Sequence, residues 1–147
     1  MPDVLIAYAS SHGTAREVAE RAAEAVRARG SSPRLADLVA GDAPDPAAFD
    51  RVLVAASVHA GVHHWDARDW LRRHHAALNR RPTTLLSVSL TADDDTPEAR
   101  AARPQAMAEL IGETAWQPSH AHAVALQPDL AQVDAAAREL AAEGAFA

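Results

Sequence analysis

Short apolar runs alternate along the chain with segments of helical periodicity. Residues 4–9, 51–58 and 83–90 carry few or no charges and are rich in apolar residues, which is typical of strands buried on both faces of a parallel sheet. Residues 34–38 and 121–126 are weaker runs of the same kind. The pattern therefore predicts five strands.

Helical patterns fill the segments between these strands. From residue 15, alanine and valine recur on one face and arginine and glutamate on the other, up to Gly30, a residue type that commonly ends helices. A second helix is expected over residues 66–78. A third helix is expected to begin at Pro104, and a fourth to be capped by Asp129.

The apolar stripes of the helices predict which faces pack on the sheet. A short helical turn is also expected at Asp45 and Pro46, because aspartate caps helices and proline is tolerated at their first position. The predicted inner faces are Ala15, Val18, Ala19, Ala22, Ala23 and Val26 in the first helix, Trp70, Leu71, His74, Ala77 and Leu78 in the second, Met107, Leu110 and Ile111 in the third, and Leu130, Val133, Ala137, Leu140 and Ala141 in the fourth.

Strands that alternate with helices indicate a parallel sheet. Parallel neighbours need a crossover connection, which is usually a right-handed helical one. Such crossovers cover both faces of the sheet with helices. We therefore expect an α/β fold, a three-layer α/β/α sandwich, with all 147 residues in a single domain.

The residue types that the sequence lacks exclude several function classes. Without cysteine, the chain holds no iron–sulfur cluster, cysteine zinc site or disulfide framework. Without lysine, Schiff-base chemistry and a P-loop nucleotide site are excluded. A net charge of −6 with scattered arginines argues against nucleic acid as a partner. No apolar stretch is long enough to span a membrane, so we expect a cytoplasmic protein.

Ligands bind such sheets in the loops at the carboxyl ends of the strands. The candidates are residues 10–15, 57–63 and 89–95, which follow the first, third and fourth predicted strands. In the first loop, hydroxyl residues and a glycine precede a helix N-terminus, where backbone N–H groups and the helix dipole favour an anion. A capped turn that binds nothing has a similar composition, and both interpretations stay open at this point.

The first loop also carries a resemblance to a known family. Ser10-Ser11-His12-Gly13-Thr14-Ala15 resembles the phosphate loop of flavodoxins. Residues 56–61, 73–82, 87–92 and 116–118 are similar, in order and approximate spacing, to the flavodoxin branch that includes menaquinone-dependent protoporphyrinogen oxidases. The resemblance covers most of the chain up to the last strand. It implies a flavodoxin-like sandwich whose five-stranded parallel sheet has the order 2-1-3-4-5.

The resemblance implies that FMN binds noncovalently, with its phosphate in the first loop and its isoalloxazine edge against the second and third. It implies electron transfer or oxidoreduction with a redox partner protein or a small-molecule electron donor or acceptor. The cofactor then carries the reaction, and no side chain is required as a catalytic acid or base. The implied cofactor-binding residues are Ser10, Ser11, His12, Gly13, Thr14, Ala15, Ser57, Val58, His59, Ala60, Gly61, Ser89, Leu90, Thr91 and Ala92.

Three departures from the family pattern support an alternative function. Ala15 stands where flavodoxins have a threonine, and His59 and Ala60 stand where relatives often place a tyrosine. Residues 127–129 join the last strand directly to the last helix, where the oxidases carry a long insertion. The alternative is a degenerate flavodoxin-like module that binds no flavin and acts as an interaction or regulatory domain.

Histidines in the second loop raise a further, weaker alternative. His59, His63 and His64 could together bind zinc or copper, but their spacing matches no common helical ligand motif, and we expect no metal site. Beside this loop, Trp65 is the tryptophan expected to contact a ligand. The other two tryptophans are expected to fill the core that so many alanines leave thin.

Overall fold

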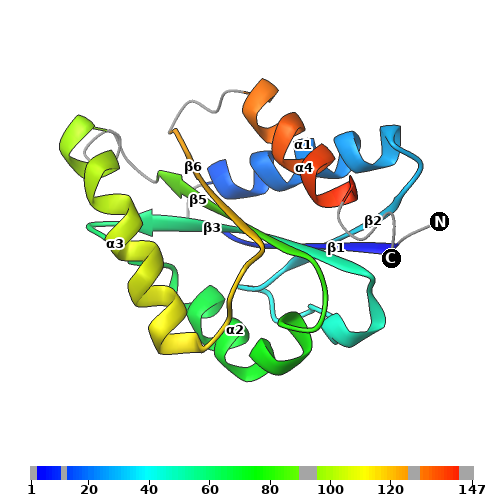
Figure 1. Ribbon diagram of the computed structural model, residues 1–147, viewed down its shortest axis with the longest axis horizontal. Helices are drawn as coiled ribbons and strands as arrows, with labels where there is room; N and C mark the ends of the chain where they lie inside the picture. Colours follow the sequence, from blue (N-terminus) through cyan, green and yellow to red (C-terminus); the bar gives the residue numbers. More distant parts are fainter. Residues whose placement is uncertain (1–2, 11–12, 90–95, 126–129, 143–147) are drawn as a thin grey trace.

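Five parallel strands form the centre of the molecule, in the spatial order β2-β1-β3-β5-β6 (Figure 1). The computed structural model describes residues 3–10, 13–89, 96–125 and 130–142. This order is the expected 2-1-3-4-5, because a short extra strand shifts the numbering. The strands are β1 (Asp3–Ala9), β2 (Ser32–Asp37), β3 (Arg51–His59), β5 (Thr83–Ser89) and β6 (His120–Val124).

Two helices cover each face of this sheet, so the predicted three-layer α/β/α sandwich is confirmed (Figure 1). One face carries α1 (Thr14–Ala28) and α4 (Leu130–Ala142), and the other carries α2 (Trp65–Leu78) and α3 (Pro97–Thr114). The predicted short turn is the 3₁₀ helix η1 (Pro46–Ala48). Within the described residues, no helix carries the long, nearly uncharged apolar stretch that a bilayer crossing requires.

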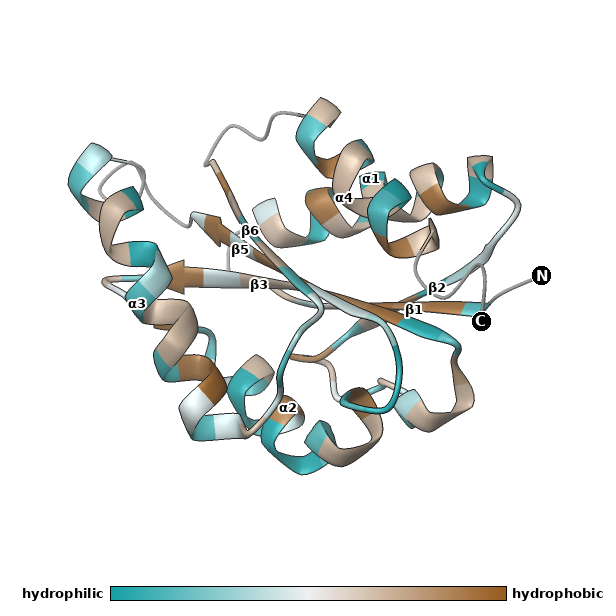
Figure 2. Ribbon diagram, in the orientation of Figure 1, coloured by the Kyte–Doolittle hydropathy of each residue, from teal (hydrophilic) through white to brown (hydrophobic). Residues whose placement is uncertain are grey.

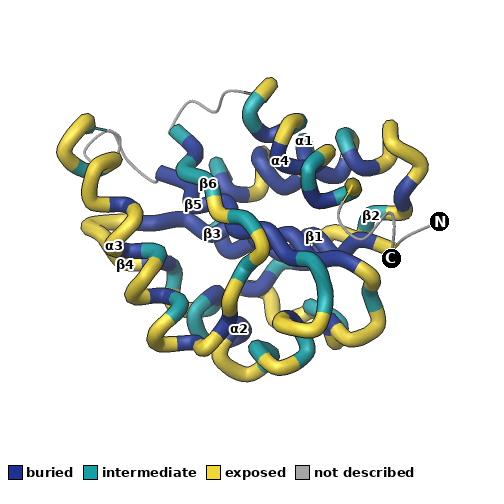
Figure 3. The backbone as a smooth tube through the Cα atoms, in the orientation of Figure 1, coloured by how far each residue is buried: buried dark blue, intermediate teal, exposed yellow. Residues whose placement is uncertain are grey.

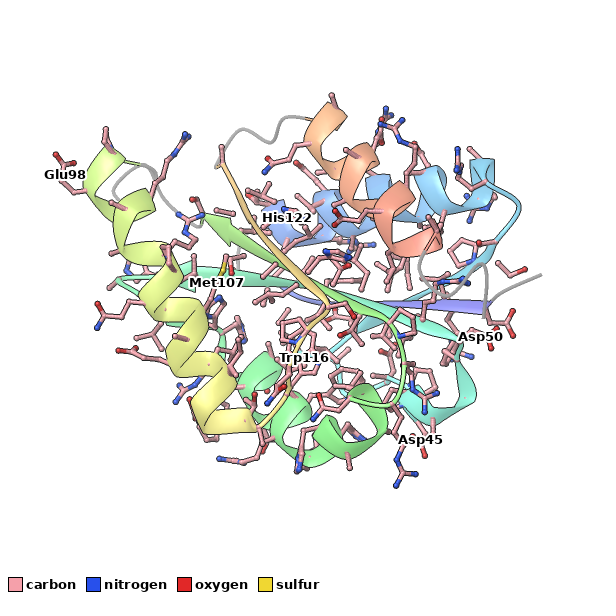
Figure 4. All side chains as sticks on the ribbon, viewed as in Figure 1. Asp45, Asp50, Glu98, Met107, Trp116 and His122 are labelled. Carbon is pink, nitrogen blue, oxygen red and sulfur yellow. The ribbon has the colours of Figure 1, made fainter. Side chains whose placement is uncertain are left out.

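The core consists of two layers, one on each side of the sheet. The central strands β1, β3 and β5 are the most apolar and most buried part of the fold, whereas the outer faces of the helices are exposed (Figures 2 and 3). The layer under α1 and α4 is built largely from alanine and valine. The layer under α2 and α3 contains Trp70 and Trp116, which confirms the core position predicted for both. The indole N–H of Trp116, labelled in Figure 4, donates to Thr83 Oγ1 at 3.1 Å.

Helix α3 begins earlier than predicted, and Pro104 lies inside it rather than at its start. Thr96 caps the helix by accepting the Ala99 N–H at Oγ1, 3.1 Å away, and Pro97 occupies the first turn. This cap and proline provide the same start signal that we assigned to Pro104. Pro104 is exposed, so its ring faces solvent rather than the packed side of the helix.

The predicted inner faces are correct in part. The face of α1 is buried as predicted. In α2, Ala67 is buried, whereas His74 and Ala77 are only half-buried. In α4, Ala136 is buried and Ala141 is half-buried. In α3 the buried positions are Arg103, Ala106, Leu110 and Thr114, whereas Met107 and Ile111 are half-buried.

A short antiparallel strand, β4 (Val62–His63), was not predicted. It pairs with the end of β3 through a two-residue turn, Ala60 and Gly61, and we call β3, this turn and β4 the β3–β4 hairpin. Both turn residues have positive φ, 52° and 81°. These values are typical of a type I′ hairpin turn, which asparagine and glycine favour and alanine does not.

The hairpin buries His63 beneath the carboxyl edge of the sheet. His63 is 3% exposed, and its Nε2 lies 2.7 Å from Ser87 Oγ on β5. Burial, and then the nearby guanidinium groups of Arg103 and Arg68, lower the pKa of His63 to about 4. His63 is therefore neutral in the folded protein at pH 7.

We expect Ala60→Asn to raise the free energy of unfolding by about 0.5–1 kcal/mol, because asparagine adopts positive φ more readily than alanine. Chemical denaturation at pH 7 measures the change. Ala40→Asn, at an exposed position without positive φ, is the matched control and should not stabilise the protein. Equal changes in the free energy of unfolding at both positions would contradict the argument that alanine is unfavourable at the positive φ of residue 60.

We expect the free energy of unfolding to rise with pH between about 4 and 6.5, because unfolded His63 binds a proton there and folded His63 does not. At pH 4 this proton binding lowers the free energy of unfolding by about 3 kcal/mol relative to pH 7. His63→Gln should lose this part of the pH dependence in denaturation experiments. Ser87→Ala should retain it, because it removes the hydrogen bond but leaves the imidazole buried. An unchanged slope in His63→Gln would refute the assignment.

Candidate functional site

The three predicted loops lie together at the carboxyl edge of the sheet. Strands β1, β3 and β5 are adjacent and parallel, so their carboxyl ends meet at one edge. Ser10 follows β1, the hairpin turn follows β3, and Ser89 ends β5. The structure thus brings the described parts of all three loops to the same side of the molecule (Figure 1).

The first loop presents backbone donors at the start of α1. The Gly13 N–H donates to Ser10 Oγ at 2.8 Å, and Gly13 caps the helix with a φ of 90°. The first helical hydrogen bond runs from the Glu17 N–H to the Gly13 carbonyl, 3.0 Å away. The N–H groups of residues 14–16 therefore have no partner within the helix, and no side chain of the described residues caps them. Such a turn suits an anion.

The surroundings of Gly13 and Ala15 show how these two predicted site residues lie in the first loop. An added Cβ at Gly13 would meet no described atom within 4 Å, so the space on that side of the loop is open. Ala15 is 1% exposed and packs into the core layer under α1. Its side chain faces the sheet. Ala15 can therefore contribute only its backbone N–H to an anion site.

A cavity of about 430 Å³ opens beside the second loop. This volume lies within the range of small-molecule sites, which are mostly apolar with a few polar groups. Val58, a predicted site residue, is among the lining residues, whereas Ser57 is buried in β3. The described lining residues are Val58, His59, Ala60 and Gly61 from the hairpin, and Ala99, Ala102, Arg103 and Ala106 from α3.

Arg103 is a residue of the site that the sequence analysis missed. Its side chain is buried at the carboxyl edge, where Nη2 donates to Ser89 Oγ at 2.7 Å. Nη1 lies 3.4 Å from the carbonyl oxygens of both Ser87 and Val124. A signal was present in the sequence, because this arginine interrupts a stripe of alanines at helical spacing. Buried arginines are rare, so such an interruption points to a specific role.

The histidines of the second loop have separate contacts. His63 contacts Ser87, whereas Nδ1 of His64 accepts the Asp66 N–H at 3.1 Å and caps α2. His59 is exposed and lines the cavity. Among the described residues, no three histidine, aspartate or glutamate side chains are arranged to hold a metal ion.

Trp65 lies at the start of α2 with 55% of its surface exposed. The guanidinium carbons of Arg68 and Arg72 lie 5.3 and 5.6 Å from its ring centroid, within range of cation–π contacts. The described lining of the cavity does not include Trp65. Its expected role as a ligand contact therefore stays a prediction.

Several predicted positions lie outside the described residues. Of the site residues, these are Ser11 and His12 in the first loop and Leu90, Thr91 and Ala92 in the third. The predicted helix cap Asp129 and the short connection at residues 127–129 also fall outside them.

Comparison with curated proteins finds a distant enzyme relative. The chain is 26% identical over 122 residues to protoporphyrinogen IX dehydrogenase [quinone] of Escherichia coli strain K12. The aligned region covers 82% of this chain and 66% of the relative, so the chain spans just under two thirds of that enzyme's length.

Solved structures and a family model agree on the fold. A flavodoxin of Streptococcus pneumoniae superposes with a TM-score of 0.71 at 21% identity, covering 96% of this chain and 99% of that one. Oxidised flavodoxin 1 of Bacillus cereus superposes with a TM-score of 0.69 at 16% identity, covering 96% and 98%. The flavodoxin domain model matches residues 5–141, and the chain therefore belongs to the flavodoxin domain family.

Proposed function

We propose that this chain is a cytoplasmic FMN protein that transfers electrons or carries out oxidoreduction. The observation that carries the proposal is the turn at the start of α1, whose geometry suits an anion and which lies at the same sheet edge as the cavity beside the hairpin. Proteins of the flavodoxin family generally bind FMN. The proposal is that the turn takes the phosphate of FMN and the cavity takes its ring.

The donors of the first loop fit a phosphate. Ser10 and Thr14 carry hydroxyl groups, and residues 14–16 present backbone N–H groups at the positive end of the helix dipole. The open space beside Gly13 leaves room for the phosphate oxygens. A phosphate would satisfy donors at the start of α1 for which the described residues provide no side-chain cap.

The second loop and α3 fit an apolar ring. Val58, Ala60 and the alanines of α3 give the cavity a largely apolar lining. The tight turn also brings backbone groups of Ala60 and Gly61 to the cavity, where they can hydrogen-bond polar ring atoms. FMN, when bound, supplies the chemistry of accepting and donating electrons, and the chain supplies binding, orientation and electrostatics.

The enzyme relative suggests a type of reaction. Its name describes a dehydrogenase that uses a quinone, and we propose that this chain likewise serves a two-electron oxidoreduction. The electron donor or acceptor is proposed to be a redox protein or a small molecule that reaches the flavin edge. No acid or base on the chain is assigned to the reaction.

The test is titration of the purified protein with FMN, followed by the loss of flavin fluorescence. We expect FMN to bind and riboflavin, which lacks the phosphate, to bind at least about tenfold more weakly, because charged hydrogen bonds contribute about 1.5–3 kcal/mol each. Gly13→Asp should weaken FMN binding by at least about tenfold, because it adds a negative charge beside the phosphate.

Two control variants isolate the effect of the added charge. Asparagine has nearly the same shape as aspartate and also tolerates positive φ, but it is uncharged. Gly13→Asn should therefore bind FMN far better than Gly13→Asp does. Gly30→Asp adds the same charge at the other end of α1, also at positive φ, and should leave FMN binding unchanged. Equal affinity for FMN and riboflavin would refute the phosphate site. No binding at high micromolar FMN would favour the alternative of an interaction module without flavin.

A further inference from the structure

We propose that an exposed surface around Trp65, beside the cavity, docks an acidic electron-transfer protein. We call it the Trp65 surface, and its residues are Val62 of the hairpin and Trp65, Arg68, Arg72 and Arg73 of α2. The inference rests on the proposed function, because such a partner exchanges electrons with a flavin in the cavity. Each transfer moves one electron between the flavin and a metal centre of the partner, so that one is oxidised as the other is reduced.

Two large apolar side chains are exposed close together on this surface. Val62 is 51% exposed on β4, and Trp65, three residues later, is 55% exposed at the start of α2. Apolar side chains that are exposed together within a polar rim are typical of interaction sites. Tryptophan and arginine are also enriched among the residues that dominate binding at protein interfaces. Trp65 therefore has the exposure and the neighbours of an interface anchor.

The Trp65 surface adjoins the cavity through the hairpin. Gly61 lines the cavity and also a small hollow of about 40 Å³, whose described lining includes Val62 and Arg68. Helices α2 and α3 lie next to each other on this face of the sheet, and a hydrogen-bonded pair, Arg68 and Glu113, joins them (Figure 1). A protein seated on the Trp65 surface therefore also reaches the side of the cavity that the hairpin forms.

Contacts within the structure hold the arginines beside the indole. Arg68 donates two hydrogen bonds to the Glu113 carboxylate, at 2.9 Å from Nε and 2.7 Å from Nη2. The guanidinium groups of Arg68 and Arg72 both lie within cation–π range of the Trp65 ring. Side chains that are ordered before binding lose less conformational entropy when a partner arrives. The surface is therefore organised in advance of docking.

Positive charge is left over at Arg72 and Arg73. Asp69 accepts from Arg72 Nη2 at 3.0 Å and from Arg73 Nε at 3.1 Å, so one carboxylate serves two guanidinium groups. These two side chains are 48% and 60% exposed, and a guanidinium has five N–H donors. Donors therefore remain for the carboxylates of a partner, which arginine binds with good geometry.

The segment that contains α2 is basic in an otherwise acidic chain. Residues 64–82 carry five arginines and two aspartates, a formal charge of +3. The remaining residues carry nine arginines and eighteen acidic residues, and the whole chain has a net charge of −6. Most of the chain therefore repels an acidic protein, whereas this segment attracts it, which steers the partner toward one surface. Charge complementarity selects an acidic partner for this reason.

An anionic membrane would also attract arginines, but the shape of the surface favours a protein. The apolar face of α2, with Ala67, Trp70 and Leu71, is buried in the core and is not available for insertion between lipids. On the Trp65 surface the exposed apolar part consists of two side chains among charged groups. A small apolar centre with a polar rim is the usual anatomy of a protein interface.

The experiment uses an acidic plant-type [2Fe–2S] ferredoxin as the probe and measures its binding to the full chain by isothermal titration calorimetry. We expect a Kd below about 0.1 mM at an ionic strength of about 0.01 M. The complex should weaken at least about tenfold at about 0.15 M, because salt screens the charges. The titration is run on the chain with FMN added and without it.

Two variants test the surface. Trp65→Ala should weaken ferredoxin binding at least about fivefold at low ionic strength, because it removes the proposed anchor. The double variant Arg72→Gln, Arg73→Gln should weaken binding about tenfold at low ionic strength and much less at high ionic strength. All three positions are exposed, so we expect both variants to fold, as circular dichroism checks.

Matched controls remove the same kinds of side chain from other surfaces. The double variant Arg27→Gln, Arg29→Gln removes two exposed arginines at the end of α1, with the same change in net charge. Leu35→Ala removes an exposed apolar side chain from β2. Both controls should leave the Kd within about twofold of wild type, as is usual for surface substitutions away from a site.

The outcomes separate this inference from the proposed function. No binding at about 1 mM ferredoxin, or equal losses in test and control variants, would overturn the docking surface even if FMN binds. Binding to phosphatidylglycerol vesicles that is stronger than ferredoxin binding, and is lost in the same variants, would overturn the protein partner in favour of a membrane. Ferredoxin that binds a chain unable to take up FMN would support the surface and overturn only the proposed flavin function.

Discussion

The parallel direction of neighbouring strands is the constraint on which the rest of this structure depends. Each parallel pair needs a crossover, and here the crossovers place two helices on each face. The strands are thereby shielded on both sides, which is why β3 and β5 consist almost entirely of buried residues. The same constraint gathers the ends of β1, β3 and β5 at one edge, where the helix α1 begins. The turn before α1 and the cavity lie at the same edge for this reason.

Most of this architecture could be predicted from the sequence, because burial on two faces leaves a strong pattern. The five parallel strands and the first two helices follow from uncharged apolar runs and helical periodicity, whereas the strand order came from the resemblance to flavodoxins. The start of α3 could not be placed, since Thr96-Pro97 and Pro104 both look like helix starts. Only packing decides between them. The β3–β4 hairpin was also missed, because an alanine at positive φ does not resemble the usual asparagine of such a turn.

The site was predictable where it depends on the backbone and less so where it depends on packed side chains. Gly13 and the hydroxyl residues predict a turn before a helix, and the structure has that turn. Arg103 is different, since its place at the cavity follows from the contact between α3 and the ends of β5 and β6. That contact joins residues far apart in the sequence. A single sequence shows only that a charged residue stands in an otherwise small and apolar stripe.

The uneven distribution of aromatic residues between the two core layers has a spectroscopic consequence. Trp70 and Trp116 both lie in the layer under α2 and α3, whereas the layer under α1 and α4 contains Tyr8 and no tryptophan among its described residues. Intrinsic tryptophan fluorescence therefore reports on one half of the protein, together with the exposed Trp65. If the helices α1 and α4 unfolded first, this emission would change little. Circular dichroism, which follows all four helices, would detect the event.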